Sequence, residues 1–175
     1  MKKPLALLAL VAISVAISGC GGKSSPKAAP LPPSQPYSGN GVSLQFPKSW
    51  QQIDVTGIGS FDFTKWNYLA TFAKSVPDSG QVAVLTVASN KTGASLKDVE
   101  TSEIQIWGDA EATDYRTVAG VKATVITTKA NSEEQSILAF FTKNGVVYEV
   151  KFGCKNENFS GEKGAIDLVL SSLKV

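Results

Sequence analysis

The sequence predicts an α+β domain built on an antiparallel sheet with helices packed against it. Several segments alternate apolar and polar residues, one pair of them flanks an Asn-Gly turn, and two other segments carry apolar residues at helical spacing. Their order is several strands, a helix, three strands that include a hairpin, and a terminal helix. Packing the helices on the sheet buries the apolar faces of both, so we expect one layered domain over 37–175.

Residues 1–19 have the features of a signal peptide. Two lysines give a positive start, and 5–17 is apolar apart from one serine. This stretch is shorter than the roughly 20 apolar residues that a spanning helix needs. It leads into Ile17-Ser18-Gly19-Cys20, which resembles the lipobox of bacterial lipoproteins. We therefore expect cleavage before Cys20 and a lipid on its thiol. An uncleaved signal anchor and an ordinary secretory cleavage are the alternatives.

The segment 20–36 is predicted to be a lipidated cysteine followed by a tether. Residues 21–36 read GGKSSPKAAPLPPSQP, with five prolines in sixteen residues. Such a composition favours extended polyproline geometry, which at about 3.1 Å per residue spans up to roughly 50 Å. A docking motif for a proline-reading groove is the alternative.

Charge and composition exclude some classes of partner. Loss of Lys2 and Lys3 with the signal leaves 15 of the 17 basic side chains to balance 15 acidic ones. A neutral chain with a single arginine, Arg116, lacks the clustered cations that nucleic acids require, so we expect no nucleic-acid partner.

The first strands are predicted by alternation. Val42, Leu44 and Phe46 share one face of a strand that Pro47 ends. The segment 81–87 carries apolar residues on both faces, which indicates a strand covered on both sides. The aromatic-rich segment 61–75 is expected to be β, although its period is ambiguous.

A central helix and a β segment follow. Ser95 and Asp98 form a capping box, after which apolar residues recur at near-helical spacing (Leu96, Val99, Ile106 and Trp107). The segment 115–128 is expected to be β, with a bend at Ala119-Gly120 and a continuation beyond it.

The last elements are a hairpin and a terminal helix. The strands 136–142 and 146–152 flank Lys143-Asn144-Gly145, and Asn-Gly favours a type I′ turn. In the second strand, Tyr148, Val150 and Phe152 share one face, and Val147, Glu149 and Lys151 share the other. The helix starts near Ser160 with Glu162 in its first turn, and its apolar stripe comprises Ile166, Val169, Leu170 and Leu173.

This order resembles the PsbP-like fold, which includes photosystem PsbP, cyanobacterial lipoproteins, DcrB and the Mog-type Ran-binding proteins. The resemblance rests on the strand leading into Phe46-Pro47-Lys48-Ser49-Trp50, the Ser95-Leu96 helix start, Val118-Ala119-Gly120-Val121, the hairpin at 145–148, and the ending Ser171-Ser172-Leu173-Lys174. Many members have phenylalanine where Leu173 stands. The resemblance implies an antiparallel sheet packed between helices, an α/β/α sandwich, and a binding or assembly role without shared enzymatic activity. It brings no catalytic residues.

Several catalytic classes are excluded by composition. The chain has no histidine, so Ser-His-Asp and Cys-His nucleophilic systems and histidine zinc sites are impossible. Neither phosphate-cradling glycine motif is present. Asp109, Glu111 and Asp114 could be read as calcium ligands, but a solvated turn is the preferred interpretation. We therefore expect no catalytic, cofactor or metal site, and no cofactor.

Two kinds of side chain remain as site candidates. If Cys20 is lipidated, Cys154 has no intramolecular partner, and we interpret it as a packed hydrophobe rather than a reactive thiol. Trp50, Trp66, Tyr68 and Trp107 are candidates for recognition. Trp50 is assigned to the core. Residues like Trp66 and Tyr68 are more often core than site, yet these two are the best candidates for an exposed partner-contact surface.

Three functions compete. The first is a non-enzymatic envelope lipoprotein, monomeric in its domain, that binds a protein partner or assembles a membrane complex. The second is a carrier or sensor of a small apolar ligand such as a lipid, which requires a cavity of several hundred Å³ between sheet and helix. The third is an enzyme that uses only carboxylates, which must converge in a cleft. Because Gly21 rather than aspartate follows Cys20, we expect the outer membrane facing the periplasm in a Gram-negative host, and otherwise the outer face of the plasma membrane.

Overall fold

A seven-stranded antiparallel sheet forms the centre of the molecule, in the order β3-β4-β5-β9-β8-β7-β6. The computed structural model describes residues 30–56, 58, 61–76, 80–131 and 133–175. The sheet strands are β3 (Gln51–Gln52), β4 (Trp66–Val76), β5 (Gly80–Asn90), β6 (Ala110–Val118), β7 (Val121–Thr128), β8 (Glu134–Lys143) and β9 (Val146–Lys155). A separate hairpin pairs β1 (Ser34–Gly39) with β2 (Val42–Pro47). The helices are α1 (Leu96–Trp107) and α2 (Phe159–Ser172), the latter preceded by a 3-10 turn, η1 (Asn156–Asn158).

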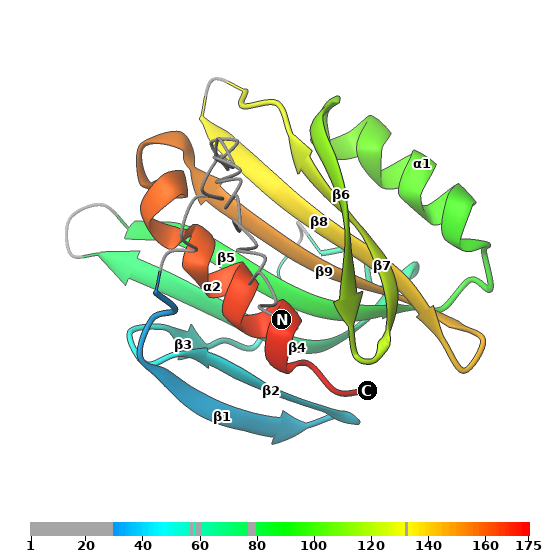
Figure 1. The fold of residues 1–175 in the computed structure, drawn as a ribbon, viewed down its shortest axis with the longest axis horizontal. Coiled ribbons are helices and arrows are strands. Elements are labelled where there is room, and N and C mark those ends of the chain that lie inside the picture. The colour runs from blue at the N-terminus through cyan, green and yellow to red at the C-terminus, as the bar shows by residue number, and fades with distance from the viewer. Residues whose placement is uncertain (1–29, 57, 59–60, 77–79, 132) are drawn as a thin grey trace, which may run out of the picture.

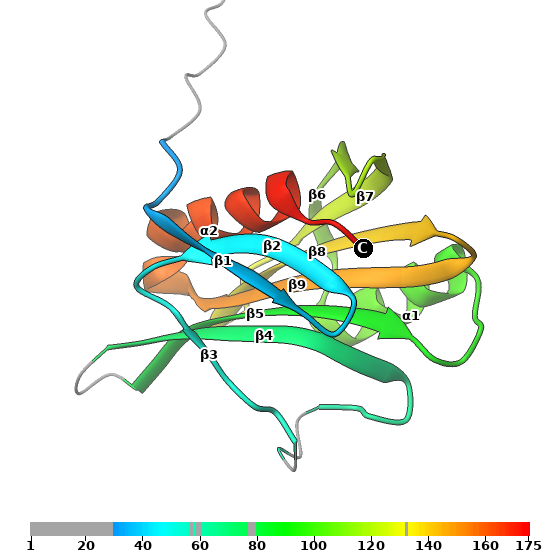
Figure 2. The ribbon, with the colours of Figure 1, turned by 90° about the horizontal axis from the view of Figure 1, so that it is seen from below.

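The two faces of the sheet are covered by different elements. The helix α2 and the β1–β2 hairpin pack on one face, and α1 packs on the other (Figures 1 and 2). The prediction of an α+β domain with its antiparallel sheet between helices is therefore confirmed. None of the described helices is long and apolar enough to cross a membrane.

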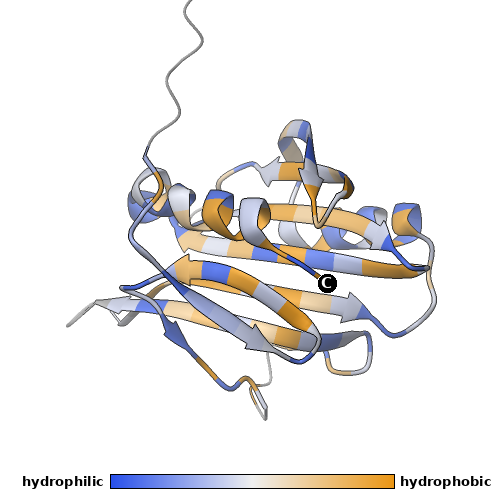
Figure 3. Ribbon diagram, turned by 60° about the horizontal axis from the view of Figure 1, so that its bottom comes forward, coloured by the Kyte–Doolittle hydropathy of each residue, from blue (hydrophilic) through white to orange (hydrophobic). Residues whose placement is uncertain are grey.

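The larger core lies under α2. Alternate residues of neighbouring strands meet there, with Phe152 opposite Leu85 on one side and Ile137 on the other. Phe46 of β2 stacks on Phe72 of β4, with ring centroids 4.2 Å apart. Hydrophobic residues of α2 and the strands face one another across this layer (Figure 3). Trp50 is only 2% exposed and belongs to this core, as expected.

The predicted hairpin turn and the predicted helix cap are confirmed in detail. Asn144 and Gly145 have φ angles of 52° and 78°, as a type I′ turn requires. The Ser95 hydroxyl accepts a hydrogen bond from the backbone N–H of Asp98 at 3.3 Å, so it caps α1. Strand β5 is buried on both faces, and α2 begins at Phe159, one residue before the predicted start.

The Pro-rich segment joins the fold earlier than expected. Residues 34–36 belong to β1 rather than to a tether that extends to Pro36, because they pair with 45–47 of β2. The turn between these strands is Asn40-Gly41, with φ angles of 50° and 80°. This is the same dipeptide that marks the later hairpin, and it could have predicted β1.

Two other expectations are wrong in position. The Ala119-Gly120 bend is a complete reversal, since both residues have positive φ, and β6 pairs antiparallel with β7. The aromatic segment becomes a strand only at Trp66, because the Asp62 side chain accepts hydrogen bonds from the backbone of Thr64 and Lys65 and holds a turn before it.

Candidate functional site

The face of the sheet under α1 carries buried polar and charged side chains. Strand β9 contributes Val147, Glu149, Lys151 and Gly153 to it, because every second residue of a strand points the same way. The sequence predicted that Val147, Glu149 and Lys151 share one face of this strand. Near its start, α1 packs Val99 over Ile126, Leu138 and Phe140 of the strands below. The remainder of this face also carries buried polar groups.

One ion pair joins α1 to the turn before β4. The Lys65 ammonium lies 2.5 Å from Glu103 Oε1 and 2.8 Å from the Ser102 hydroxyl. The Trp107 indole N–H donates a hydrogen bond of 3.0 Å to Glu103 Oε2. Glu103 is only 3% exposed, and both of its oxygens are engaged. These contacts fix the end of α1 and the orientation of the Trp107 ring.

Glu149 lies beneath the same helix with one oxygen unsatisfied. It is 1% exposed, and its Oε1 has no hydrogen-bond partner among the described residues. Burial raises the pKa of Glu149 to about 8, and the Glu103 charge raises it further, while Lys151 and Lys65 act in the opposite direction. The carboxyl group is therefore mostly protonated at neutral pH.

A pocket of about 330 Å³ opens beside this cluster, where α1 ends. Its floor is the sheet, its walls are Trp107 and the segment between β3 and β4, and its apolar lining comprises Ile53, Ile58, Phe61, Val84 and Trp107. The polar lining comprises Thr86, Glu134, Ser136 and Lys151, with Gly153 at the floor. The Lys151 ammonium lies 4.0 Å from the centroid of the Trp107 ring, a cation–π contact.

Gly153 keeps the floor of this pocket open. Its backbone does not adopt the left-handed conformation that favours glycine, and an added Cβ would meet only the Ser136 hydroxyl, at 3.8 Å. Neither backbone geometry nor crowding requires a glycine here. A glycine inside a strand weakens the strand and often marks the close approach of another group. The absence of a side chain at Gly153 leaves space over this part of the sheet.

Exposed apolar side chains lie in the lining of the pocket or next to lining residues in the chain or by contact. Ile58 is 41% exposed and lines the pocket, whereas Ile106 on α1 is 64% exposed although it lies three and seven residues after the sheet-facing Glu103 and Val99. Phe63, at 39% exposure, contacts Phe61 and Tyr68. Apolar side chains that face a sheet yet remain exposed indicate an uncovered surface.

The aromatic site prediction is half wrong. Trp66 is 3% exposed and packs in the core under α1, so it offers no contact surface. Trp66 lies on the face of the sheet that α1 covers, and a β-bulge follows Tyr68 in the same strand. Because the period of this segment is ambiguous in the sequence, the burial of Trp66 could not be predicted. Tyr68 is half-buried between Phe61 and Phe63, and a partner role for it stays a prediction. Trp107, also singled out by the sequence, lies at the pocket.

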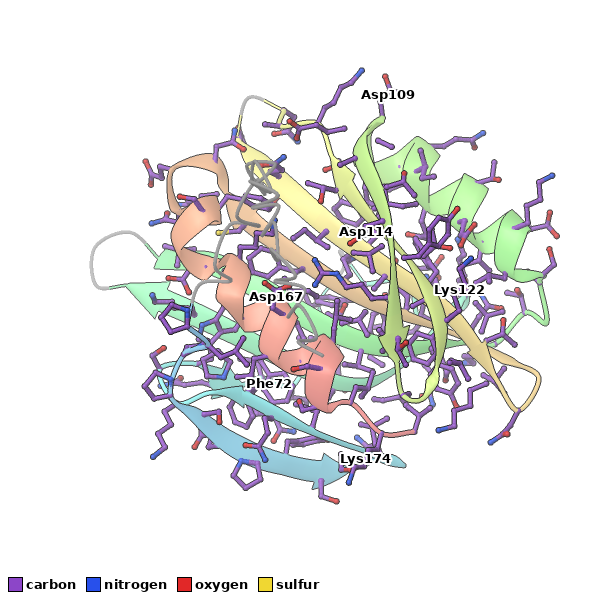
Figure 4. The ribbon with its side chains drawn as sticks, in the orientation of Figure 1. Phe72, Asp109, Asp114, Lys122, Asp167 and Lys174 are labelled. Atoms are coloured by element: carbon purple, nitrogen blue, oxygen red, sulfur yellow. The ribbon has the colours of Figure 1, made fainter. Side chains whose placement is uncertain are left out.

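The acidic stretch does not converge in a cleft. Glu111 and Asp114 lie on the exposed edge strand β6, and not in a turn after the helix as expected; Asp109 directly precedes that strand. The Asp109 and Asp114 side chains are 83% and 69% exposed, and Figure 4 places them well apart along β6. Asp114 shares Arg116 with Asp167 of α2. This arrangement argues against the carboxylate enzyme, and the described residues contain no cluster of three candidate metal ligands.

Cys154 is a packed residue, as predicted. It is 1% exposed within the core under α2, and burial raises the pKa of its thiol to about 11. A thiol held protonated in this way is a poor nucleophile. The other cysteine, Cys20, and the predicted signal 1–19 lie outside the described residues.

Three larger pockets occur elsewhere. One of about 620 Å³ lies at the end of β5 and β9 beside charged and polar residues of 133–134 and 155–157. Another, of about 660 Å³, separates β1 and β2 from the end of α2 and the β6–β7 turn. A third, of about 520 Å³, is lined by Phe63, Tyr68 and the buried Thr71, but its lining is more polar than apolar. Of these four pockets the one beside α1 has the most apolar lining, and for that reason we treat it as the candidate site.

The comparisons with known proteins concern the fold. The chain is similar to cyanobacterial PsbP (CyanoP) from Synechocystis sp. PCC 6803, with a TM-score of 0.53 and 17% identity, over 91% of this chain and 98% of that one. The fold is therefore PsbP-like, as the sequence resemblance implied. No family model and no curated protein matches the chain.

Two further structures are more distant. LpqN of Mycobacterium tuberculosis, described as involved in cell envelope biogenesis, has a TM-score of 0.49 and 10% identity over 81% of this chain and 84% of that one. PA94 of Pseudomonas aeruginosa, described as a putative regulator, has a TM-score of 0.43 and 12% identity over 77% and 91%. At these scores the two likenesses add nothing to the fold assignment.

Proposed function

We propose that this chain is a lipid-anchored protein of the cell envelope with a non-enzymatic binding role. The signal-like segment that ends at Cys20 supports the anchor and the location. The PsbP-like fold and the dispersed acidic residues are compatible with binding rather than catalysis. In a Gram-negative host the anchored domain would face the periplasm from the outer membrane.

The bound molecule is a small apolar ligand held in the pocket beside α1. A single observation carries this choice: a 330 Å³ space with aromatic and aliphatic walls lies between sheet and helix, over a glycine that nothing in its own strand requires. That volume falls within the usual range for ligand sites, and a few polar groups at the floor are typical of them.

A neutral fluorescent probe tests ligand binding. The chain from residue 20, with Cys20→Ser to prevent lipidation, is titrated with N-phenyl-1-naphthylamine. We expect saturable 1:1 binding, and we expect Gly153→Leu to weaken it by at least about tenfold because the new side chain fills the pocket. Gly161→Leu adds the same side chain at an exposed position of α2 and should leave binding unchanged. Equal binding by a folded Gly153→Leu protein would contradict the proposal.

A protein partner is the second candidate, and three exposed apolar side chains in or next to the pocket lining favour it. Ile58, Phe63 and Ile106 are large and uncovered, and aromatic and aliphatic anchors of this kind are common at binding hot spots. Crosslinking the membrane-anchored protein in cells and comparing it with Ile106→Lys tests this function. Loss of a defined crosslinked species in the variant is expected, and an unchanged set of species would count against it.

A further inference from the structure

We propose that the pocket beside α1 takes an amphipathic acid, with its carboxylate at Thr86 and Lys151 and its apolar part against Phe61 and Trp107. This assignment rests on the proposed function, because it names the chemical class of the ligand for the same pocket. It depends on two hydrogen-bond donors at the floor that the protein itself leaves unused.

The first donor is the Thr86 hydroxyl. Thr86 is 0% exposed and lines the pocket, and its Oγ1 has no hydrogen-bond partner in the part of the chain that the structure describes. An unsatisfied buried hydroxyl is destabilising; Thr71 carries another one, but outside this pocket. A valine would fit the same space without that cost. The hydroxyl is therefore best explained by a partner that the chain does not supply.

The second donor is the Lys151 ammonium, which lies next to Thr86. The two residues are directly paired in the register of β5 and β9 and point to the same face of the sheet. Within residues 30–56, 58, 61–76, 80–131 and 133–175, Lys151 forms no ion pair, and its polar contact is the Trp107 ring. A cation over an aromatic ring at the base of a pocket is available to an anion.

The neighbouring carboxyl groups do not neutralise Lys151. Glu103 is already paired with Lys65. Glu149, two residues along β9, is mostly protonated at neutral pH because burial raises its pKa to about 8. Glu134 lines the pocket as well, but it is four residues from Leu138, which pairs with Lys151, and so lies roughly 13 Å away along the sheet. One positive charge is left at this end of the floor.

The size of the pocket limits the apolar part of the ligand. At the roughly 30 Å³ that each water molecule occupies in the liquid, 330 Å³ holds about eleven non-hydrogen atoms. This suits a medium-chain fatty acid or a small aromatic acid. A longer chain would extend past Ile58, which lines the pocket and is exposed. Fatty and aromatic acids share the same head-group chemistry, and the experiment separates them.

The test compares head groups on one apolar chain. Octanoate, 1-octanol and octylammonium each displace N-phenyl-1-naphthylamine from the Cys20→Ser chain at pH 7. We expect octanoate to bind about tenfold more tightly than octanol, since hydrogen bonds to charged groups contribute roughly 1.5–3 kcal/mol, and octylammonium to bind most weakly. A parallel titration with 3-phenylpropanoate shows whether aromatic or aliphatic acids are preferred, and either preference supports the shared chemistry.

Three variants locate the head group. Lys151→Met and Thr86→Val should each reduce the preference for octanoate over octanol, by about tenfold and at least threefold respectively, and this ratio cancels any general change in binding. Lys163→Met, on an exposed position of α2, is the matched control and should change nothing. Thr86→Val removes only an unpartnered hydroxyl, so it keeps the test decisive even if Lys151→Met does not fold.

The outcomes separate this inference from the function on which it rests. If octanoate and octanol bind equally well, or if neither pocket variant changes their ratio, the carboxylate assignment is overturned and the apolar ligand site stands. Tighter binding of octylammonium overturns it as well. If neither the neutral probe nor any octyl compound binds, the proposed function itself fails.

Discussion

Glu149 shows at the scale of one residue how the fold can change the chemistry of a side chain. An acidic residue in a strand is ordinarily ionised at neutral pH, but here it is enclosed by β5, β8 and α1. The charged or titratable groups that act on it are Glu103 of α1, Lys65 before β4, Lys151 of its own strand, and Tyr68 of β4. Burial dominates these charges, and the raised pKa couples protonation to folding.

The pH dependence of stability should reveal this coupling. The folded-state pKa of Glu149, about 8, exceeds the ordinary pKa of 4.5 for a glutamate carboxyl, so the folded protein holds a proton that the unfolded chain releases between these pH values. Stability is therefore highest below about pH 4.5 for this group and falls as the pH rises toward 8. Relative to Glu149→Gln, the native protein should lose on the order of 4 kcal/mol over that range.

Urea denaturation at pH 5, 7 and 9 measures the difference between the two proteins. Groups that titrate in both proteins cancel in this comparison. Glu157→Gln, on an exposed residue of η1, is the matched control and should follow the native profile. Parallel curves for native protein and Glu149→Gln from pH 5 to pH 9 would show that Glu149 is not buried as described.

The sequence could predict which face of the strand Glu149 and Lys151 occupy, but not whether that face is buried. Strict alternation in 146–152 put both side chains opposite Tyr148, Val150 and Phe152, and the register confirms this. Whether that face is open to water depends on α1 and on the segment before β4, which are distant along the chain. The same holds for Thr86 and Gly153. The predicted strand 146–152 ended before Gly153, so only the structure shows this glycine inside β9.

The two helices illustrate the scale of elements, because they pack very differently. Five consecutive or nearly consecutive residues of α2 are buried: Ala165, Ile166, Leu168, Val169 and Leu170. In α1 only Val99 and Glu103 are buried, and Ile106 is 64% exposed. Both helices have apolar residues at 3–4 spacing in the sequence. The difference arises because α2 lies along the middle of the larger core, whereas the end of α1 overhangs the pocket.

A matched pair of isoleucines tests this contrast. Ile166→Ala should lower the free energy of unfolding by about 2–5 kcal/mol, the usual effect of a cavity in a packed core. Ile106→Ala should change it by less than about 0.5 kcal/mol, because the side chain is largely in water. Urea midpoints with unchanged slopes measure both. A cost above about 2 kcal/mol for Ile106→Ala would mean that something covers this side of α1.

The strands show where local patterns suffice and where they do not. Asn144-Gly145 specified its hairpin because both residues accept positive φ at low cost. Ala119 has a φ of 51°, which alanine seldom adopts, and so the reversal between β6 and β7 looked like a bend. Gly120, with a φ of 82°, is the local signal for a bend, but the complete reversal depends on the pairing of β6 with β7.

At the scale of the whole molecule, the chain enters on the face opposite the pocket. Pro32 lies against Gly164 of α2, and the first described residues run beside this helix (Figure 2). The pocket lies under α1, on the other side of the sheet.

Substitution of the lipidated residue tests the anchor in cells. Cys20→Ser should move the protein from the membrane fraction to the aqueous fraction, because acyl chains contribute about 0.8 kcal/mol per buried methylene. The domain should keep its far-UV circular dichroism, since the described core lies within 30–175. Fractionation and mass spectrometry of the N-terminal peptide give the result. A variant that stays with the membrane as the native protein does would rule out lipid anchoring at this position.

By itself the sequence determined the order of most strands and both helices, the faces of β9, and the packed state of Trp50 and Cys154. These follow from local periodicity, capping and turn chemistry, which short segments carry in full. Only the tertiary structure decided the position of the pocket, the burial of Trp66 and Glu149, and the unpartnered Thr86 beside Lys151. Each of these depends on which segments meet across the sheet, and that is settled by packing between residues far apart in the chain.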